Sequence, residues 1–540
     1  MSFAPASFAP ADERARSINP FAGRDVNWLL DERAATRGDH PFLVWEPFVG
    51  ERNVWTYSQF RDAVLRVAAG LYARGIKAGD AVLVHLDNAP ELELLWFACA
   101  RIGAVVVTTN TRSSGEELAY FAEHCRAVAA ITQPELRGLV ERNAKYIRWL
   151  VVTEHLADGT PCADADLPSK EHRFSSLDGD PDTLPRLDAD PWRPGSVQYT
   201  SGTTSRPKGV LWTHGNALWG ASASAAHEDL TADDIHLVMM PSFHTNARAY
   251  SILPTMWAGG TAVLMPRFSA SRFWDVALRN RCTWASMLPF FCKALMLHPV
   301  PAHHFRMFGM SANEPPFDQH FKVRSIGWWG MTETVTHGIV GDARQRNRTL
   351  TTGRPAPGYG IRILHPDGSP VAPGETGHLE CHGIRGIHLF LEYLNNPEAT
   401  SDSFTADDWF KTGDRVTLAE DGALVFADRD KDMLKVGGEN VAASEIERVI
   451  LQVPGVYEAA VVGQKHRMLD EVPVVFIIAE PSVPAADHAG LSARILVACR
   501  ERLADFKVPR AVHVVSELPR STLEKIHKVE LRKLLPEIDG

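Results

Sequence analysis

A strand–helix–strand pattern between residues 81 and 109 constrains the fold more than any other feature of the sequence. Two short apolar runs, AVLVHL at 81–86 and AVVVTT at 104–109, flank a stretch from Pro90 to Arg101 in which apolar residues recur at helical spacing. A helix between two strands is the crossover connection that parallel strands require. The sequence therefore predicts a βαβ unit and an α/β fold.

Changes of pattern divide the rest of the chain. Its 540 residues are enough for about three or four structural units. Residues 157–195 are rich in Asp, Pro, Ser and Gly, which predicts a long surface connection. Alternating apolar runs after it predict a second α/β region, and the closely spaced Gly/Pro turns of residues 353–427 predict a mainly β subdomain.

The pattern changes again after Asp428. Helix-like and strand-like runs follow one another there, and they make a unit small enough to move independently. We therefore expect an α/β protein with two domains. Residues 1–427 form a large N-terminal domain of two α/β sheet subdomains plus a β subdomain. Residues 428–540 form a small, mobile α+β C-terminal domain with a hinge near 428–435.

Charge, cysteine content and hydropathy exclude several classes of protein. The 56 Lys and Arg against 66 Asp and Glu give a net charge of −10, which argues against nucleic-acid binding. The seven cysteines are scattered without a Cys-x-x-Cys pair, so a zinc ribbon or redox dithiol is not expected and a reducing cytosol fits. No run of 18 apolar residues and no secretory signal pattern occurs. We expect a cytoplasmic protein with no integral membrane segment.

The segment YTSGTTSRPKGV, residues 199–210, is the first candidate site. Its hydroxyl side chains, glycines and single ammonium at Lys208 suit a polyphosphate, because they offer many donors with little bulk. It is not a Walker A loop, since no Gly precedes Lys208 and Gly209 stands where Ser or Thr would bind magnesium. A polar surface turn is the alternative, because such composition is common in turns.

The segment GWWGMTETVTHG, residues 327–338, is the second candidate. Glu333 follows Thr332, and one carboxylate beside a hydroxyl suits a magnesium ion that keeps several waters and bridges to nucleotide phosphates. The alternative is an ordinary helix start with a capping Thr and a Glu in the first turn.

Two further segments lie toward the C-terminus. Asp414, in a Thr-Gly-Asp turn, could accept hydrogen bonds from ribose hydroxyls, and Gly437-Gly438 would allow a ligand to approach the backbone closely. Lys525 precedes a basic, periodic tail. Ordinary turns and a solvated lysine are the alternatives.

In order and wording these four segments resemble the adenylate-forming superfamily, which includes acyl-CoA synthetases, luciferases and nonribosomal adenylation domains. The resemblance extends from WTYSQF, beginning at Trp55, to Lys525. It implies ATP, Mg²⁺ and CoA as cofactors and co-substrates. The ATP-binding residues that it implies are Thr200, Ser201, Gly202, Thr203, Thr204, Lys208, Ala312, Asn313, Glu314, Trp329, Gly330, Met331, Asp414 and Arg429.

The resemblance also implies individual roles. Trp329 stacks on adenine, Thr332 contacts phosphate and Glu333 holds Mg²⁺. His244 borders the carboxylate of the substrate. Among the residues beyond Asp414, the resemblance implies a catalytic Lys525, a hinge at Lys431, a thioester-forming face with Lys435, and CoA-binding residues Gly437 and Gly438.

Three departures from the superfamily pattern stand out. Ser205 replaces the commoner Gly, Trp329 replaces Tyr, and Leu523-Glu524 replaces Ser-Gly before Lys525. Glu524 places an acid beside the ammonium that the resemblance makes catalytic.

Three functions fit these motifs. The expected one is an ATP-dependent carboxylate–CoA ligase that forms acyl-CoA through an acyl-adenylate. The second is a stand-alone adenylation enzyme that loads a carrier protein, although SFHTNA at 242–247 offers no acid for an amino-acid substrate. The third is a catalytically impaired nucleotide-binding homologue. The phrases PSFHTNA and SGTTSRPKG resemble those of medium-chain, carnitine-type and aromatic acid CoA ligases. The expected partners are a small carboxylic acid and CoA, and a homodimer is left open.

Overall fold

The computed structural model describes residues 19–200, 206–429, 433–436, 439–466, 470–520 and 526–535. The chain divides into two compact units. The first contains residues 1–361 and 381–411, and the second contains residues 362–380 and 412–540. The domain boundary expected between residues 427 and 428 stays a prediction.

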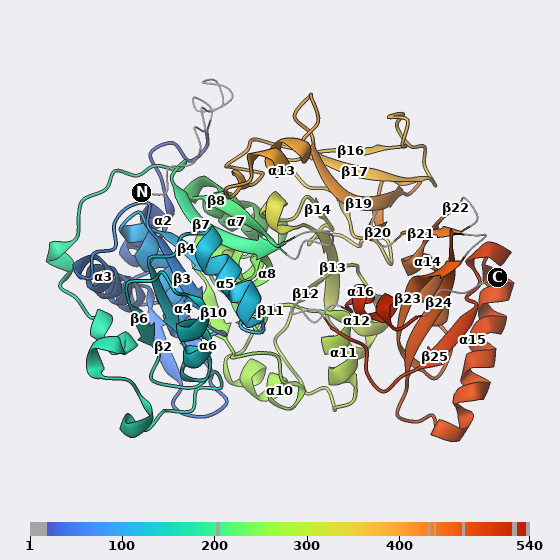
Figure 1. Ribbon diagram of the computed structural model, residues 1–540, viewed down its shortest axis with the longest axis horizontal. Coiled ribbons are helices and arrows are strands. Elements are labelled where there is room, and N and C mark those ends of the chain that lie inside the picture. Colours follow the sequence, from blue (N-terminus) through green and yellow to red (C-terminus); the bar gives the residue numbers. More distant parts are fainter. Residues whose placement is uncertain are drawn as a thin grey trace. The chain divides into compact units, whose positions relative to one another are not determined.

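The first sheet contains the predicted βαβ unit (Figure 1). Strand β3 (Ala81–His85), helix α4 (Pro90–Arg101) and strand β4 (Val105–Thr108) follow in that order, and the two strands pair in parallel. Helix α4 begins with a proline and carries two glutamates in its first turn, as the missing N–H of proline and the helix dipole favour. The sheet has the spatial order β18-β8-β7-β4-β3-β5-β6, with β5 (Ala129–Thr132), β6 (Leu150–Val152), β7 (Pro194–Thr200), β8 (Lys208–Thr213) and β18 (Glu392–Tyr393).

Helices cover both faces of this sheet (Figure 1). Val82 and Val84 of β3 pack into the large core that includes residues of α3 (Tyr57–Ala73) and α4. Ala81 and Leu83 point to the opposite face, into a core with residues of α5 (Gly115–His124) and α6 (Arg137–Asn143). Burial on both faces is why these strands are continuously apolar.

The second sheet has the order β15-β14-β13-β12-β11-β9-β10-β1-β2. Its strands are β1 (Pro41–Trp45), β2 (Asn53–Thr56), β9 (Ile235–Val238), β10 (Thr261–Leu264), β11 (Trp284–Ser286), β12 (Met307–Met310), β13 (Arg324–Trp329), β14 (Ile339–Val340) and β15 (Arg354–Pro355). The other helices of this unit are α2 (Val26–Arg37), α7 (His214–His227), α8 (Thr245–Ala247), α9 (Leu253–Ala258), α10 (Ala270–Arg279), α11 (Pro289–Met296), α12 (Pro315–Phe321) and α13 (Pro397–Asp402). The expected second α/β region is thus confirmed.

The second unit contains a sheet of order β16-β17-β19-β20 and a sheet built on β23 and β24. The strands of the first are β16 (Gly360–Leu364), β17 (Thr376–His382), β19 (Phe410–Leu418) and β20 (Leu424–Arg429). The second has β21 (Met433–Val436), β22 (Glu439–Ala442), β23 (Val456–His466), β24 (Asp470–Ala479) and β25 (Ala511–Val514), with helices α14 (Ala443–Ile450), α15 (His488–Arg502) and α16 (Lys528–Lys533). Val461 of β23 packs into one apolar cluster and its neighbours Ala460 and Val462 into another, so both faces of this sheet are buried.

Two more expectations can be checked against the fold. Of the connection expected at 157–195, residues 157–193 contain short 3₁₀ turns and isolated bridges at Pro161 and Arg173, whereas β7 already begins at Pro194. No helix among the described residues is both long and apolar enough to cross a membrane. The α/β class with a large N-terminal and a small C-terminal part is confirmed.

Candidate active site

The loop predicted to bind phosphate connects β7 and β8, which pair as a hairpin with Thr200 opposite Lys208. Ser201, Gly202, Thr203 and Thr204 lie outside the described residues. The hairpin is anchored where it meets α5. The Tyr199 ring lies 4.2 Å from that of Phe121, and the Tyr199 hydroxyl is 2.9 Å from Nδ1 of His124. The two ends of the loop are therefore held by fixed strands.

Tyr393 brings the first two candidate segments together. Strand β18 pairs with β8, which places the Tyr393 ring under the ammonium of Lys208, 4.5 Å from Nζ to the ring centroid. The Tyr393 hydroxyl donates a hydrogen bond of 2.9 Å to Oε1 of Glu333. Burial and this carboxylate raise the pKa of Tyr393, so the hydroxyl remains a donor. Nothing in the sequence around Tyr393 indicated this role.

Glu333 belongs to the 3₁₀ turn Thr332–Thr334, which follows β13. The carbonyl of Thr332 accepts a hydrogen bond of 2.8 Å from the indole of Trp212. The hydroxyl of Thr332 lies 3.2 Å from the hydroxyl of Thr245. The Thr245 hydroxyl also lies 2.9 Å from Oε1 of Gln198 on β7. This buried chain of polar groups ties the turn to the strand that leads into the phosphate loop. Sequence reasoning missed Thr245 and Gln198, which carry no motif of their own.

The turn ends in a strained backbone conformation at Val335. This residue has φ 64° and ψ −55°, and the N–H of Thr336 donates to the carbonyl of Thr334 at 2.6 Å across it. The geometry is that of a γ-turn with positive φ, which is rare and costly for a β-branched residue. Such strain persists only where the surroundings over-determine it, and it clusters at functional sites.

The segment predicted to border adenine, residues 312–314, follows the carboxyl end of β12, just as the turn with Glu333 follows the carboxyl end of β13. Strands β12 and β13 pair in parallel, with Met310 opposite Gly327, so their carboxyl ends lie side by side. One end leads to Ala312, Asn313 and Glu314, and the other to Trp329, Gly330 and Met331. Ligands of open α/β sheets bind at this edge.

Side-chain packing fixes both of these segments. Oδ1 of Asn313 accepts a hydrogen bond of 3.1 Å from the backbone N–H of Thr351. Burial raises the pKa of Glu314. The Trp329 ring packs on Gly338, where an added Cβ would lie 2.9 Å from the ring. Adenine stacking by Trp329 stays a prediction.

His244 caps α8, and its Nδ1 accepts a hydrogen bond of 3.3 Å from the N–H of Asn246. Asn88 holds the preceding residues in place. It accepts a hydrogen bond of 2.6 Å from the N–H of Ser242 and donates to the carbonyls of Met240 and Met265.

The second unit carries the remaining predicted residues. Asp414 of β19 stands opposite Arg429 of β20 in the strand register. The N–H of Asp414 donates to the hydroxyl of Thr412 at 3.1 Å. Lys435 lies on β21 opposite Asn440. Lys431, Gly437, Gly438 and Lys525 lie outside the described residues.

The residues at Glu333 fit a magnesium ion that has few protein ligands. Among the described residues, no three His, Cys, Asp or Glu side chains converge as a metal cage would require. Mg²⁺ commonly binds through one or two carboxylates, taking its other ligands from water and substrate phosphates. Glu333 offers one buried carboxylate beside the hydroxyl of Thr332.

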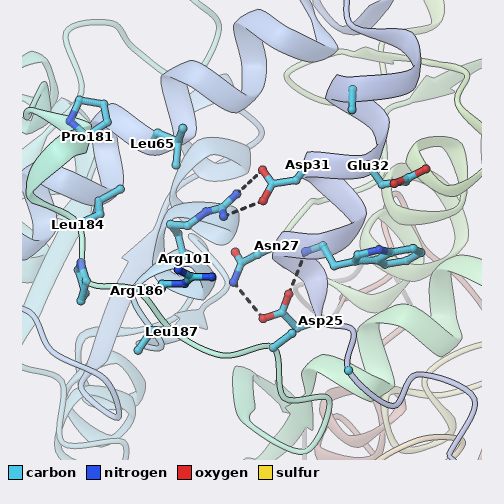
Figure 2. A pocket seen from close by; sticks show the side chains of 15 residues that line it. Asp25, Asn27, Asp31, Glu32, Leu65, Arg101, Pro181, Leu184, Arg186 and Leu187 are labelled. Carbon is cyan, nitrogen blue, oxygen red and sulfur yellow. Dashed lines mark hydrogen bonds and ion pairs between the residues drawn. The ribbon is translucent and has the colours of Figure 1, made fainter.

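A separate pocket of about 670 Å³ lies against α2, between that helix and residues 181–189 (Figure 2). Two of its charged groups pair with each other, since Arg101 makes two contacts with Asp31 at 2.7 and 2.9 Å. Asp25 is engaged in capping α2 through the N–H of Trp28. No predicted site residue lines this pocket.

Comparison with known proteins agrees with the motifs. The model of the AMP-binding enzyme family matches residues 30–394, and that of the AMP-binding enzyme C-terminal domain matches residues 445–525. Crotonobetaine/carnitine–CoA ligases from Salmonella paratyphi C (strain RKS4594) and Salmonella choleraesuis (strain SC-B67) are each 32% identical over 528 residues, covering 94% of this chain and 99% of each relative.

Solved structures show the same fold. ATP-bound MatB from Rhodopseudomonas palustris matches with a TM-score of 0.82 and 25% identity, over 94% of this chain and 99% of that one. The anthranilate CoA ligase AuaEII in complex with anthranoyl-AMP matches with a TM-score of 0.86 and 24% identity, over 96% of this chain and 98% of that one.

Proposed function

The chain belongs to the AMP-binding enzyme family, and on that premise we propose that it is an ATP-dependent carboxylate–CoA ligase. It forms an acyl-adenylate with release of pyrophosphate, and then acyl-CoA with release of AMP. The observation that carries the proposal is the contact chain from Lys208 through Tyr393 to Glu333. It joins an ammonium at the end of a predicted phosphate loop to a buried carboxylate.

In the first half-reaction, a carboxylate oxygen of the acid attacks the α-phosphorus of ATP and pyrophosphate leaves. The chain's own contribution is to position the reactants and to stabilise charge. Negative charge gathers because the carboxylate of the acid, the α-phosphate and the leaving pyrophosphate lie close together. Lys208 faces that charge, and Thr332 is held by Thr245 and Trp212 so that its hydroxyl can contact phosphate. Glu333 would hold Mg²⁺, which supplies charge neutralisation at the phosphates.

In the second half-reaction, the thiol sulfur of CoA attacks the acyl carbonyl, the thiol proton is lost and AMP leaves. The second unit is proposed to supply the residues that distinguish the two steps. Lys525 serves adenylation, Lys435 with Gly437 and Gly438 serves thioester formation, and Lys431 is the hinge between the two arrangements. Asp414 and Arg429 bind the ribose.

We take a carnitine-type acid as the substrate class. The relatives that are 32% identical are named for crotonobetaine and carnitine, which carry a carboxylate and a trimethylammonium group. Medium-chain and aromatic acids are the alternatives within this function, and a carrier-protein thiol is the alternative acceptor. A reducing cytoplasm is supported by the seven cysteines, none of which forms a disulfide in the structure as described. Homodimer formation and the absence of nucleic-acid binding belong to the same proposal.

The test is a panel of carboxylic acids incubated with ATP, Mg²⁺ and the purified protein, with and without CoA. AMP release that needs both an acid and CoA, together with acid-dependent exchange of pyrophosphate into ATP, is the expected result. Exchange without any CoA thioester would point to carrier loading. Nucleotide binding without exchange on any acid would point to an impaired homologue.

A further inference from the structure

An ion pair in the core joins helix α4 to the segment that follows His244. Glu93 of α4 and Arg248 are both buried, with exposed fractions of 0% and 1%. Nη1 of Arg248 contacts Oε2 of Glu93 at 2.5 Å. The guanidinium also lies 4.8 Å from the ring centroid of Trp96, one turn further along α4. One face of α4 therefore holds this guanidinium with both a carboxylate and an aromatic ring.

Stability does not explain this pair. Oε1 of Glu93 has no hydrogen-bond partner among the described residues. Burying an ion pair costs the desolvation of both groups, so the pair is often no more stabilising than apolar side chains of similar volume. An unpartnered carboxylate oxygen adds to that cost. What the two charged groups provide, and apolar groups do not, is a contact of fixed direction between two particular positions of the chain.

Arg248 also reaches back to the loop that carries His244, residues 239–244, which we call the His244 loop. Nη2 of Arg248 donates a hydrogen bond of 3.4 Å to the carbonyl of Ser242. The backbone N–H of Arg248 donates to the carbonyl of His244 at 3.1 Å. Arg248 also begins the π-helical turn Arg248–Ile252, a distortion that is frequent at functional sites. Its side chain thus connects α4 with the backbone two residues before His244.

Other contacts hold the His244 loop on the same side. Asn88, in the connection from β3 to α4, accepts from the N–H of Ser242 at 2.6 Å and donates to the carbonyl of Met240 at 2.9 Å. Thr108, at the end of β4, donates to the carbonyl of Phe243 at 3.1 Å. The loop is therefore attached to elements of the first sheet and its helix, although β9, which leads into it, belongs to the second sheet.

The residue that follows the His244 loop points to the candidate active site. The hydroxyl of Thr245 lies 3.2 Å from the hydroxyl of Thr332, which directly precedes Glu333. His244 thus lies in a short segment that Arg248 joins to α4 and Thr245 joins to the turn with Glu333. A shift of this segment would move His244 relative to that turn. A misplacement of about 1 Å can lower a reaction rate by ~10²-fold.

We propose that Glu93 and Arg248 are positioning residues for adenylation, because their buried ion pair sets where His244 holds the carboxylate of the acid relative to the turn Thr332–Thr334. This inference rests on the proposed function and adds two residues that do not touch the substrate. The pair serves the first half-reaction, in which the carboxylate and ATP must meet in line. It matters less for the second, because the acyl group is then already joined to AMP.

The test replaces the ion pair by apolar side chains in the double variant Glu93→Leu/Arg248→Met. Since such a replacement is often neutral for stability, the Tm should stay near that of the wild type. We expect kcat for acid-dependent pyrophosphate exchange to fall by about 10–100-fold, with an unchanged KM for ATP. Thioester formation from a supplied acyl-adenylate should remain close to that of the wild type.

Two further variants make the result specific. Arg248→Lys keeps a positive charge opposite Glu93, but one ammonium does not reproduce the fixed fork of a guanidinium that contacts two acceptors. We expect a smaller loss of exchange, again with the second step spared. The matched control is Asp31→Ala/Arg101→Met, which removes a more exposed ion pair between α2 and the last residue of α4. It should leave exchange unchanged, because such pairs contribute little.

Wild-type exchange in Glu93→Leu/Arg248→Met or in Arg248→Lys would overturn the inference. An equal loss of both half-reactions, with a lower Tm, would also overturn it, because the pair would then support only the fold. If the double variant does not fold, Arg248→Lys decides through the same comparison of the two half-reactions. Failure of the wild type to catalyse exchange with any acid of the panel is a different result, since it would refute the proposed function and the inference with it.

Discussion

At the scale of single residues, the site depends on one hydroxyl that no motif indicated. Tyr393 contacts both Lys208 and Glu333, so it holds opposite charges at a fixed separation. Its own pKa is raised, and it can only donate to the carboxylate. Glu333 is therefore the acceptor for Tyr393 through its Oε1.

Replacing Glu333 by Gln should retain the fold and remove the charge proposed to hold Mg²⁺. We expect acid-dependent pyrophosphate exchange to fall by about 10²–10³-fold, the usual cost of a lost transition-state contact. Thermal unfolding measured on the same sample should be close to that of the wild type. Near-normal exchange at saturating Mg²⁺ would place the metal elsewhere.

Tyr393→Phe should isolate the contribution of the hydroxyl, since the ring under Lys208 is kept. A hydrogen bond to a charged group contributes about 1.5–3 kcal/mol, so we expect exchange to fall by roughly tenfold or more. The KM for Mg²⁺ should rise more than that for the acid. Tyr146→Phe, at a residue 78% exposed, is the control and should have no effect. Equal loss in both variants would contradict the assignment.

At the scale of elements, one support carries Glu333. It consists of the carboxyl ends of β12 and β13 and the turn Thr332–Thr334 that follows β13. Gly330 stands where a side chain has no room, because an added Cβ would meet the Tyr250 hydroxyl at 2.4 Å and the Thr336 carbonyl oxygen at 2.6 Å. The glycine therefore permits the close approach that brings the turn with Glu333 against the Tyr250 helix. Val335, with its positive φ of 64°, ends the same turn.

Gly330→Ala should displace this turn. Overpacking of a buried site costs about 1–3 kcal/mol, so we expect a lower Tm and a loss of exchange activity larger than the stability change explains. The control is Gly490→Ala within α15, where an added Cβ meets only the end of the Arg494 side chain at 3.7 Å. That variant should be neutral or more stable, since alanine favours a helix. An unchanged Gly330→Ala protein would show that the turn can relax.

At the scale of the whole molecule, the chain from Leu434 onward has apolar clusters of its own, which suits the proposed rotation of the part beyond Lys431. A unit with its own core can rotate as a body, and domain rotation is a common way to present different residues to one site. The three lysines with proposed roles, Lys431, Lys435 and Lys525, are the means to test this.

Lys525→Ala should abolish acid-dependent pyrophosphate exchange yet still form thioester from a supplied acyl-adenylate. Lys435→Ala should do the reverse, because its proposed role begins only after rotation. Lys431→Pro, which restricts the proposed hinge, should spare exchange and block the second step. Lys533→Ala is the control, since Lys533 forms an exposed pair with Glu530. Equal impairment of both half-reactions in Lys525→Ala and Lys435→Ala would contradict the rotation mechanism.

The sequence alone determined the features that depend on neighbours along the chain. Apolar periodicity predicted β3, α4 and β4, because a helix and a strand differ in which residues share a face. Loop composition and motif order indicated the segments at 199–210 and 327–338 and, through the resemblance, the family to which the chain belongs. These signals depend on residues that are neighbours in the chain, so they can be recognised without knowing how the chain packs.

Only the tertiary structure decided which distant residues meet. Tyr393 reaches Glu333 because β18 pairs with β8, and Thr332 is joined to Gln198 through Thr245. Glu93 and Arg248, 155 positions apart, likewise meet only in the folded chain. Strand pairing and burial are set by the free energy of the whole packed core, to which segments far apart in the chain contribute together. No short segment of the sequence contains all the contributions to that free energy.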